Sequence, residues 1–338
     1  MAASVRDARL RIGRPPVGAG CAPEGMGAMP EGMGAVPEGV GATPVLTQQL
    51  INGVVLGSMY ALIAQGYTLV FGVLDKLNFS HGEIFMLGGF LCLAALALGA
   101  PLVVAVLLAI LVSGLLGLLV EFVGFRKFRS RDAHVTAALS SFAIGLIMID
   151  LSQKIWGTEP RALDLPAGLQ AATIRILGTD VVLLRLGVLA VALLLMLVLH
   201  LVVTRSRLGR QIRAVAESAD KAALFGIDVT RVNQKVFFIA SAMAGLAGAA
   251  MALRTGYAST DVGFTFGLKA LAIMAIGGMG DLRGALIGGL LVGVVEAVAF
   301  NFGLGQLADL LVWLFMIAVL LWRPSGLFGS SLSRETRA

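Results

Sequence analysis

The sequence predicts an all-α, polytopic integral membrane protein with about 8–10 transmembrane helices, and three observations predict it. Hydrophobic residues make up 58% of the 338 residues and charged residues only 14%, whereas soluble proteins average about 45–50% apolar and about 25% charged residues. From Leu46 onward, apolar stretches long enough to cross about 30 Å of hydrocarbon follow one another. Lysine and arginine gather in the short loops between these stretches, as in the cytoplasmic loops of membrane proteins.

Nine apolar stretches are the predicted spans. They are residues 49–73, 84–100, 102–124, 135–155, 181–203, 234–253, 264–279, 285–302 and 306–322. Lipid offers no hydrogen-bond partners, so the backbone must satisfy itself within each span, which favours helices. Small residues recur at four-residue spacing, for example Ala240, Ala244 and Gly248. This spacing favours closely packed helices. The stretch 264–279 is short and flanked by glycine, so we expect it to bend or re-enter.

Three basic segments set the predicted orientation: 126–131, 205–213 and Arg323. Basic loops face the cytoplasm, and even numbers of predicted spans separate the three, so all can lie inside together. The segment 157–180 and the N-terminus then lie outside, and the C-terminus lies inside (N-out/C-in). The arginines of residues 6–14 do not oppose this, because they lie beyond the range of about 20 residues over which the charge rule acts.

The net charge of +6 follows from these loops, so we expect a lipid bilayer and no nucleic acid as the partner of the basic residues. The three histidines are far apart, and Cys21 and Cys92 have no ligand-like spacing. The sequence therefore predicts no metal site and no bound cofactor.

Residues 1–44 are of low complexity, with a Pro-Glu-Gly repeat beginning at Pro23, Pro30 and Pro37. Proline and glycine at this density prevent a helix and bury no core. We expect either a disordered N-terminal extension or a misassigned start codon, with Met26, Met29 or Met33 as the true start. The transmembrane domain then spans 45–329, and 330–338 form a cytoplasmic C-terminal tail.

The longest polar interruption of the apolar region is 204–233. It predicts two short cytoplasmic helices, one over about 210–217 and a second capped by Ser218 or Asp220 and ended by Gly226. Such helices with an apolar face either dock on a partner or rest on lipid headgroups. Composition leaves both interpretations open.

Polar residues gather before the second span, at Asn78, Ser80, His81 and Glu83, with Gly82 among them. Polar groups at membrane depth are costly and commonly line a cavity or pair with one another. Broken helices near the midplane can bind charged substrate groups. The alternative is that Asn78 and Glu83 only cap the second helix at the interface.

Glu296 lies in the middle of the eighth span and needs a partner. Lys269, in the preceding span, is the predicted one. Glu296 is also a candidate for the lining of a translocation path.

Several motifs resemble the permeases of ABC importers for branched-chain amino acids, in order from about residue 49 to 329. They are Gln49-Leu50-Ile51-Asn52-Gly53, Leu77-Asn78-Phe79-Ser80-His81-Gly82-Glu83, Gly209-Arg210-x2-Arg213-Ala214-x2-Glu217, Ala222-Ala223-Leu224-x-Gly226-Ile227, Gly277-Gly278-Met279-Gly280 and Arg323-Pro324-Ser325-Gly326. The early motifs resemble the shorter of the family's two permease types. Ser80 stands where alanine is expected, Asp281-Leu282-Arg283 replaces an uncharged turn, and residues 1–44 have no counterpart.

The resemblance implies that 204–233 is a coupling loop docking on a separate ATPase. It implies a coupling role for Gly209, Arg210, Arg213, Ala214, Glu217 and Gly226. It also implies four partners: a second related permease, two cytoplasmic ABC ATPase subunits and an extracytoplasmic substrate-binding protein.

The implied function is import of branched-chain amino acids across the bacterial inner membrane by alternating access. The sequence holds no G-x-x-x-x-G-K-[ST] nucleotide motif, so we expect a transport subunit, not an enzyme, with ATP bound by its partners. Two alternatives remain: the same architecture importing urea or short-chain amides, and an ion-coupled secondary transporter.

Overall fold

The computed structural model describes residues 42–128, 133–162, 172–176 and 179–329. The predicted extension and C-terminal tail lie outside this part of the chain, apart from residues 42–44, which begin the first helix.

Each of the nine predicted spans corresponds to a helix in the described residues. The helices are α1 (Ala42–Leu74), α2 (His81–Ala97), α3 (Leu102–Val120), α4 (His134–Trp156), α6 (Leu183–Arg205), α9 (Val229–Thr255), α10 (Val262–Gly277), α11 (Leu282–Asn301) and α12 (Ala308–Trp322). Short π and 3-10 turns, η1 (Glu121–Phe125) and η3 (Gly305–Leu307), extend α3 and precede α12. Seven of these spans are long and apolar enough to cross a bilayer, while α2 and α10 are shorter.

Two small antiparallel pairs of strands join the helices, which the all-helical prediction did not anticipate. β1 (Arg161–Ala162) pairs with β4 (Tyr257–Ala258), and β2 (Thr173–Ile176) pairs with β3 (Thr179–Val182). β2 and β3 are rich in β-branched residues, which favour extended backbone. The predicted span at 181 therefore begins as a helix only at Leu183.

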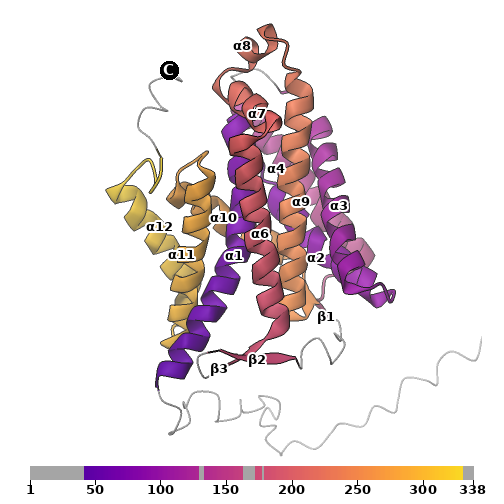
Figure 1. Cartoon of the computed structure of the whole chain (residues 1–338). Coiled ribbons are helices and arrows are strands. Elements are labelled where there is room, and N and C mark those ends of the chain that lie inside the picture. Colours follow the sequence, from indigo (N-terminus) through magenta and orange to yellow (C-terminus); the bar gives the residue numbers. More distant parts are fainter. Residues whose placement is uncertain (1–41, 129–132, 163–171, 177–178, 330–338) are drawn as a thin grey trace, which may run out of the picture. The chain divides into compact units, whose positions relative to one another are not determined.

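The described parts of the three basic segments, 126–128, 205–213 and Arg323, lie at one end of the helices, where Figure 1 shows α7 (Arg207–Glu217) and α8 (Ala219–Leu224). Hydrogen bonds tie the loops at this end together. His134 Nδ1 contacts the Asp75 carbonyl at 2.7 Å, and the Leu327 N–H donates to the Ile276 carbonyl at 2.8 Å. The strands lie at the opposite end. Even numbers of spans were predicted between the basic segments, and this agrees with their position at one end of the helices.

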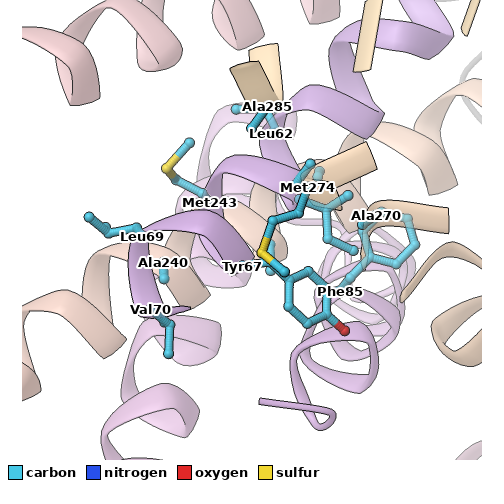
Figure 2. Packing of buried hydrophobic residues seen from close by; sticks show 14 of the residues in the cluster. Leu62, Tyr67, Leu69, Val70, Phe85, Ala240, Met243, Ala270, Met274 and Ala285 are labelled. Atoms are coloured by element: carbon cyan, nitrogen blue, oxygen red, sulfur yellow. The ribbon is translucent and has the colours of Figure 1, made fainter. Parts of the chain in front are cut away.

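Glycine and alanine let the inner helices pack backbone to backbone. Gly57 of α1 packs against Gly293 of α11, and Gly88 of α2 packs against Gly245 of α9. The predicted small-residue rows of α9 lie in these contacts: Ala240, Ala244 and Gly248 are all buried. The apolar core forms around α1 and α9, and Figure 2 shows part of it near Tyr67 and Phe85. In lipid this close packing takes the place of the hydrophobic effect between helices.

Replacing Gly88 with alanine is expected to destabilise the fold by about 1–3 kcal/mol, the usual cost of overpacking. A Cβ at Gly88 would overlap the backbone of Gly245, which no side-chain rotation can relieve. The measurement is the fraction of detergent-solubilised protein that stays monodisperse after heating. Gly187→Ala is the matched control, because a Cβ there has nothing within 4 Å. Equal loss in both variants would contradict the prediction.

Candidate functional site

The chain re-enters the bundle between α1 and α2. After Leu74 the segment 75–80 turns back from the basic end, and α2 begins only at His81. The buried Lys76 side chain donates a hydrogen bond to the Phe128 carbonyl, and the Phe79 N–H donates to Ser141 Oγ of α4 at 2.9 Å. The re-entry is therefore fastened to the loop before α4 and to α4 itself.

The first turn of α2 lies near the middle of the predicted membrane. The ring of His81 packs against Tyr67, with centroids 4.6 Å apart, and against Gly66. Gly66 lies eight residues before the end of α1, which at 1.5 Å per residue is about 12 Å. Gly145, which contacts Ser80 and Glu83, lies eleven residues into α4, or about 16 Å. Both depths are close to half of a hydrocarbon core of about 30 Å.

The polar motif at this turn does not act as a helix cap. Ser80 occupies the N-cap of α2 but makes no side-chain hydrogen bond to it. Instead Ser80 Oγ donates to Asn78 Oδ1 at 2.7 Å, and both side chains are buried. Glu83 is 4% exposed, and its Oε2 has no hydrogen-bond partner among the described residues. Of the five predicted motif residues, Glu83 lines a cavity in the described part of the chain, whereas Asn78, Ser80, His81 and Gly82 do not, and a role in a translocation path stays a prediction.

Glu83 faces a cavity of about 70 Å³ between α2, α4 and α10. Tyr67 of α1 and Glu83 of α2 are the lining residues with polar side-chain atoms, and the others are apolar or glycine. The lining residues are Tyr67, Phe79, Glu83, Phe142, Gly145, Leu146, Ile149, Gly263, Phe264, Gly267, Leu268 and Leu271. One water needs about 10–15 Å³ of such volume, so the cavity has room for a larger group.

Gly82 and Gly263 make this meeting of helices possible. Gly82 lies in the first turn of α2 and Gly263 in the first turn of α10, and a Cβ at Gly82 would overlap the Gly263 carbonyl. A Cβ at Gly263 would overlap the Glu83 carboxylate in turn. The first turns of the two short helices thus converge on Glu83.

Glu296 lies outside this cavity, in a buried ion network. The predicted pair forms, since Lys269 Nζ is 3.3 Å from Glu296 Oε1. Tyr60 donates a hydrogen bond to Glu296 Oε2 at 2.7 Å, and Asp309 Oδ1 lies 2.6 Å from Lys269 Nζ. The network joins α1, α10, α11 and α12. The prediction that Glu296 lines a translocation path gains no support from this position.

The polar segment 204–233 forms two short helices at the basic end, as predicted, and Figure 1 shows both. The Ser206 hydroxyl accepts from the Gly209 N–H at 3.0 Å and starts α7. The Ser218 hydroxyl accepts from the Lys221 N–H at 3.3 Å and starts α8, so Ser218 rather than Asp220 is the cap. Gly226 follows α8 with φ +78°, a left-handed conformation that favours glycine.

Some of the other motif residues of this loop contact the end of α6, and others are exposed. A Cβ at Gly209 would overlap the Val203 carbonyl of α6, and Arg213 donates a hydrogen bond to that same carbonyl. Ala214 is half-buried, while Arg210 and Glu217 are exposed. Gly209 and Arg213 therefore fix α7 on the end of α6.

The apolar residues of the loop also fall into a buried group and an exposed group. Ile212 and Val215 of α7 and Ala222 of α8 pack into the core. Leu224 and Phe225, which we call the loop tip, are 87% and 86% exposed. These two exposed side chains are the ones available for either predicted contact, with a partner or with lipid headgroups, and the sequence alone could not distinguish them from the three buried ones.

A family model described as the permease component of a branched-chain amino acid transport system matches residues 49–320. The chain belongs to this permease family. The permease is 32% identical to the high-affinity branched-chain amino acid transport system permease protein BraD of Pseudomonas aeruginosa, over 83% of this chain and 95% of the relative. It is 34% identical to LivH of Salmonella typhimurium and 33% identical to LivH of Escherichia coli, each again over 83% of this chain and 95% of the relative.

The matched region holds both the cavity and the two-helix loop, and the resemblance identified from the motifs is confirmed. Three residues were not predicted: Tyr67, which lines the cavity, and Tyr60 and Asp309, which belong to the ion network. Tyr60 is a tyrosine within the first apolar span, and Asp309 is an acid at the start of the last span. Those signals single the residues out but do not indicate their partners.

Proposed function

We propose that the permease is a membrane-spanning subunit of an ATP-driven importer that carries branched-chain amino acids into the cell. The observation that carries the proposal is its 32–34% identity, over nearly the full length of the relatives, to permeases named for these amino acids. The membrane would be the bacterial plasma (inner) membrane, with the basic end in the cytoplasm. Transport would proceed by alternating access between the two faces.

Energy would come from two separate ATPase subunits, one of them bound at the loop tip of this permease. The exposed Leu224 and Phe225 offer an apolar anchor at the basic end, and aromatic residues are frequent hot spots of interfaces. Arg210 and Glu217 would lie at the rim, while Gly209 and Arg213 hold the loop on α6 so that its movement reaches the spans. Gly226 would set the angle of the tip, and Ala214 would let α7 pack closely.

A second, related permease would complete the path. The mouth of the cavity is lined by Phe142, Leu146 and Phe264, which are 41%, 51% and 52% exposed. Hydrocarbon lipid against this mouth would leave the polar groups behind it without partners. We therefore place a second permease against α4 and α10, so that the substrate path lies between the two proteins. A binding protein would supply substrate from outside.

The experiment is uptake by the complex purified with its partners and reconstituted in liposomes. Labelled leucine is expected to accumulate at least tenfold faster with ATP than without it. Unlabelled isoleucine and valine should compete, and urea at the same concentration should not. Competition by urea would replace the proposed cargo, and uptake that persists without the ATPase subunits would overturn the ATP-driven mechanism.

A further inference from the structure

We infer that the cavity between α2, α4 and α10 is a substrate-binding site in which the Glu83 carboxylate receives the ammonium group of a small aliphatic amino acid. This inference rests on the proposed function and adds a site and a recognition group to it. Three features of the cavity carry it: the state of Glu83, the chemistry of the walls and the arrangement of the helices around it.

The Glu83 carboxylate lacks a countercharge. The side chain is 4% exposed, and no ion pair involving it forms among the described residues, in contrast to Glu296 with Lys269. Glu83 lines the cavity, and its buried Oε2 has no hydrogen-bond donor among the described residues. A buried carboxylate is strongly destabilised unless it is paired and hydrogen-bonded. A ligand with a cationic group and N–H donors would supply the countercharge and the hydrogen bonds that Glu83 lacks.

The remaining walls are suited to an aliphatic group. Leu146 and Ile149 of α4 line the cavity together with Leu268 and Leu271 of α10. They provide apolar surface without a polar atom, while Glu83 provides the polar group at one end. Binding sites of this kind use a mainly hydrophobic lining and few polar groups that fix orientation. The combination matches a molecule with an ammonium group on one side and a branched hydrocarbon chain on the other.

The first turns of α2 and α10 converge on the site and place Glu83 against α10. A side chain at Gly82 or Gly263 would push these turns apart, so glycine lets Glu83 lie directly against α10. Both helices are short, and both begin inside the bundle after an irregular segment. Interrupted helices that meet near the midplane are a common way of building transport sites. A small shift of α10 relative to α2 would change access to Glu83.

The test is Glu83→Gln in the reconstituted complex. The substitution keeps the shape and removes the negative charge. ATP-driven leucine uptake is expected to fall at least tenfold, and the stimulation of ATP hydrolysis by substrate should be lost. Assembly and ATP hydrolysis without substrate should stay within twofold of the unmodified protein. Glu83→Asp, which keeps the charge on a shorter side chain, should recover part of the uptake.

The matched control is Glu121→Gln, the same substitution at another buried acid that does not line the cavity. Its uptake is expected to stay within twofold. If Glu83→Gln and Glu121→Gln behave alike, the carboxylate has no special role and the inference is overturned.

A second measurement reports binding directly. In a protein with Cys21 and Cys92 replaced by alanine, Leu146→Cys places a thiol in the wall of the cavity. Leucine should slow labelling of this thiol at least fivefold, whereas 4-methylpentanoate, which lacks the ammonium group, should not. Adding Glu83→Gln should abolish the protection. Equal protection by both compounds, or protection that survives Glu83→Gln, would overturn the inference. Loss of ATP-driven leucine uptake in the unmodified complex would instead refute the proposed function.

Discussion

Replacing Lys269 with methionine is expected to destabilise the permease by about 3–5 kcal/mol, the cost of leaving a buried charge without its partner. Lys269 is 6% exposed and holds Glu296, which is 9% exposed, at 3.3 Å. It also donates to Tyr60 Oη at 3.2 Å. Without the ammonium group, the Glu296 carboxylate would keep only the Tyr60 hydroxyl. The measurement is the temperature at which half of the solubilised protein loses its monodisperse peak.

The network also predicts an order of effects. Glu296→Gln should cost less than Lys269→Met, because Lys269 would still pair with Asp309 at 2.6 Å. Asp309→Asn should cost least, since the Asp309 side chain is 59% exposed and water compensates for the lost pair. The double variant Lys269→Met/Glu296→Met should recover much of the stability lost in Lys269→Met, because it removes both buried charges. A double variant no more stable than the single one would show that the unpaired carboxylate is not the cause.

The second large effect is expected at the loop tip. Replacing both Leu224 and Phe225 with serine should weaken binding of the ATPase subunit at least 100-fold. Burial of a leucine or phenylalanine side chain is worth about 1.5–3 kcal/mol, and a 100-fold change in affinity needs about 2.7 kcal/mol. Both side chains are almost fully exposed, so the permease itself should fold normally. The measurement is the affinity of the purified ATPase subunit for the permease in nanodiscs.

Lys221→Ala is the control for the loop tip. Lys221 lies on the same short helix and is exposed, but it offers a charge at the rim and no apolar surface. Rim charges contribute little to affinity, so this variant should bind within a few-fold of the unmodified permease. Unchanged binding of the double serine variant would remove the loop tip from the interface and would leave Arg210 and Glu217 as the residues to test.

The two effects differ in kind, which makes them separable. The ion network acts within the permease and should alter stability without a partner. The loop tip acts only between proteins and should alter assembly without changing stability. Thermal unfolding and ATPase binding should therefore both be measured on Lys269→Met and on the double serine variant of the loop tip. The two measurements together distinguish a folding defect from a coupling defect.

The sequence by itself determined the helices, their order and the family. Nine apolar stretches predicted nine helices, because in lipid a run of apolar residues can satisfy its backbone only as a helix. It also predicted the partner of Glu296, since a buried charge requires one and Lys269 lies in the preceding span. The Gly226 stop and a cap at either Ser218 or Asp220 followed from local rules that involve few neighbouring residues, and the structure decided for Ser218.

Only the tertiary structure decided which polar residues meet. Glu83 is separated from Gly145 by 62 positions and from Gly263 by 180, and no local pattern links them. Nor could the pattern show that the first turn of α2 lies near mid-depth, because that depth is set by the helices packed around it. The same holds for the loop, where Ile212 and Val215 are buried while Leu224 and Phe225 are exposed. The spacing of residues along the chain determines which side chains share one face of a helix. Contacts between distant segments determine which residues, lipid or solvent that face is packed against.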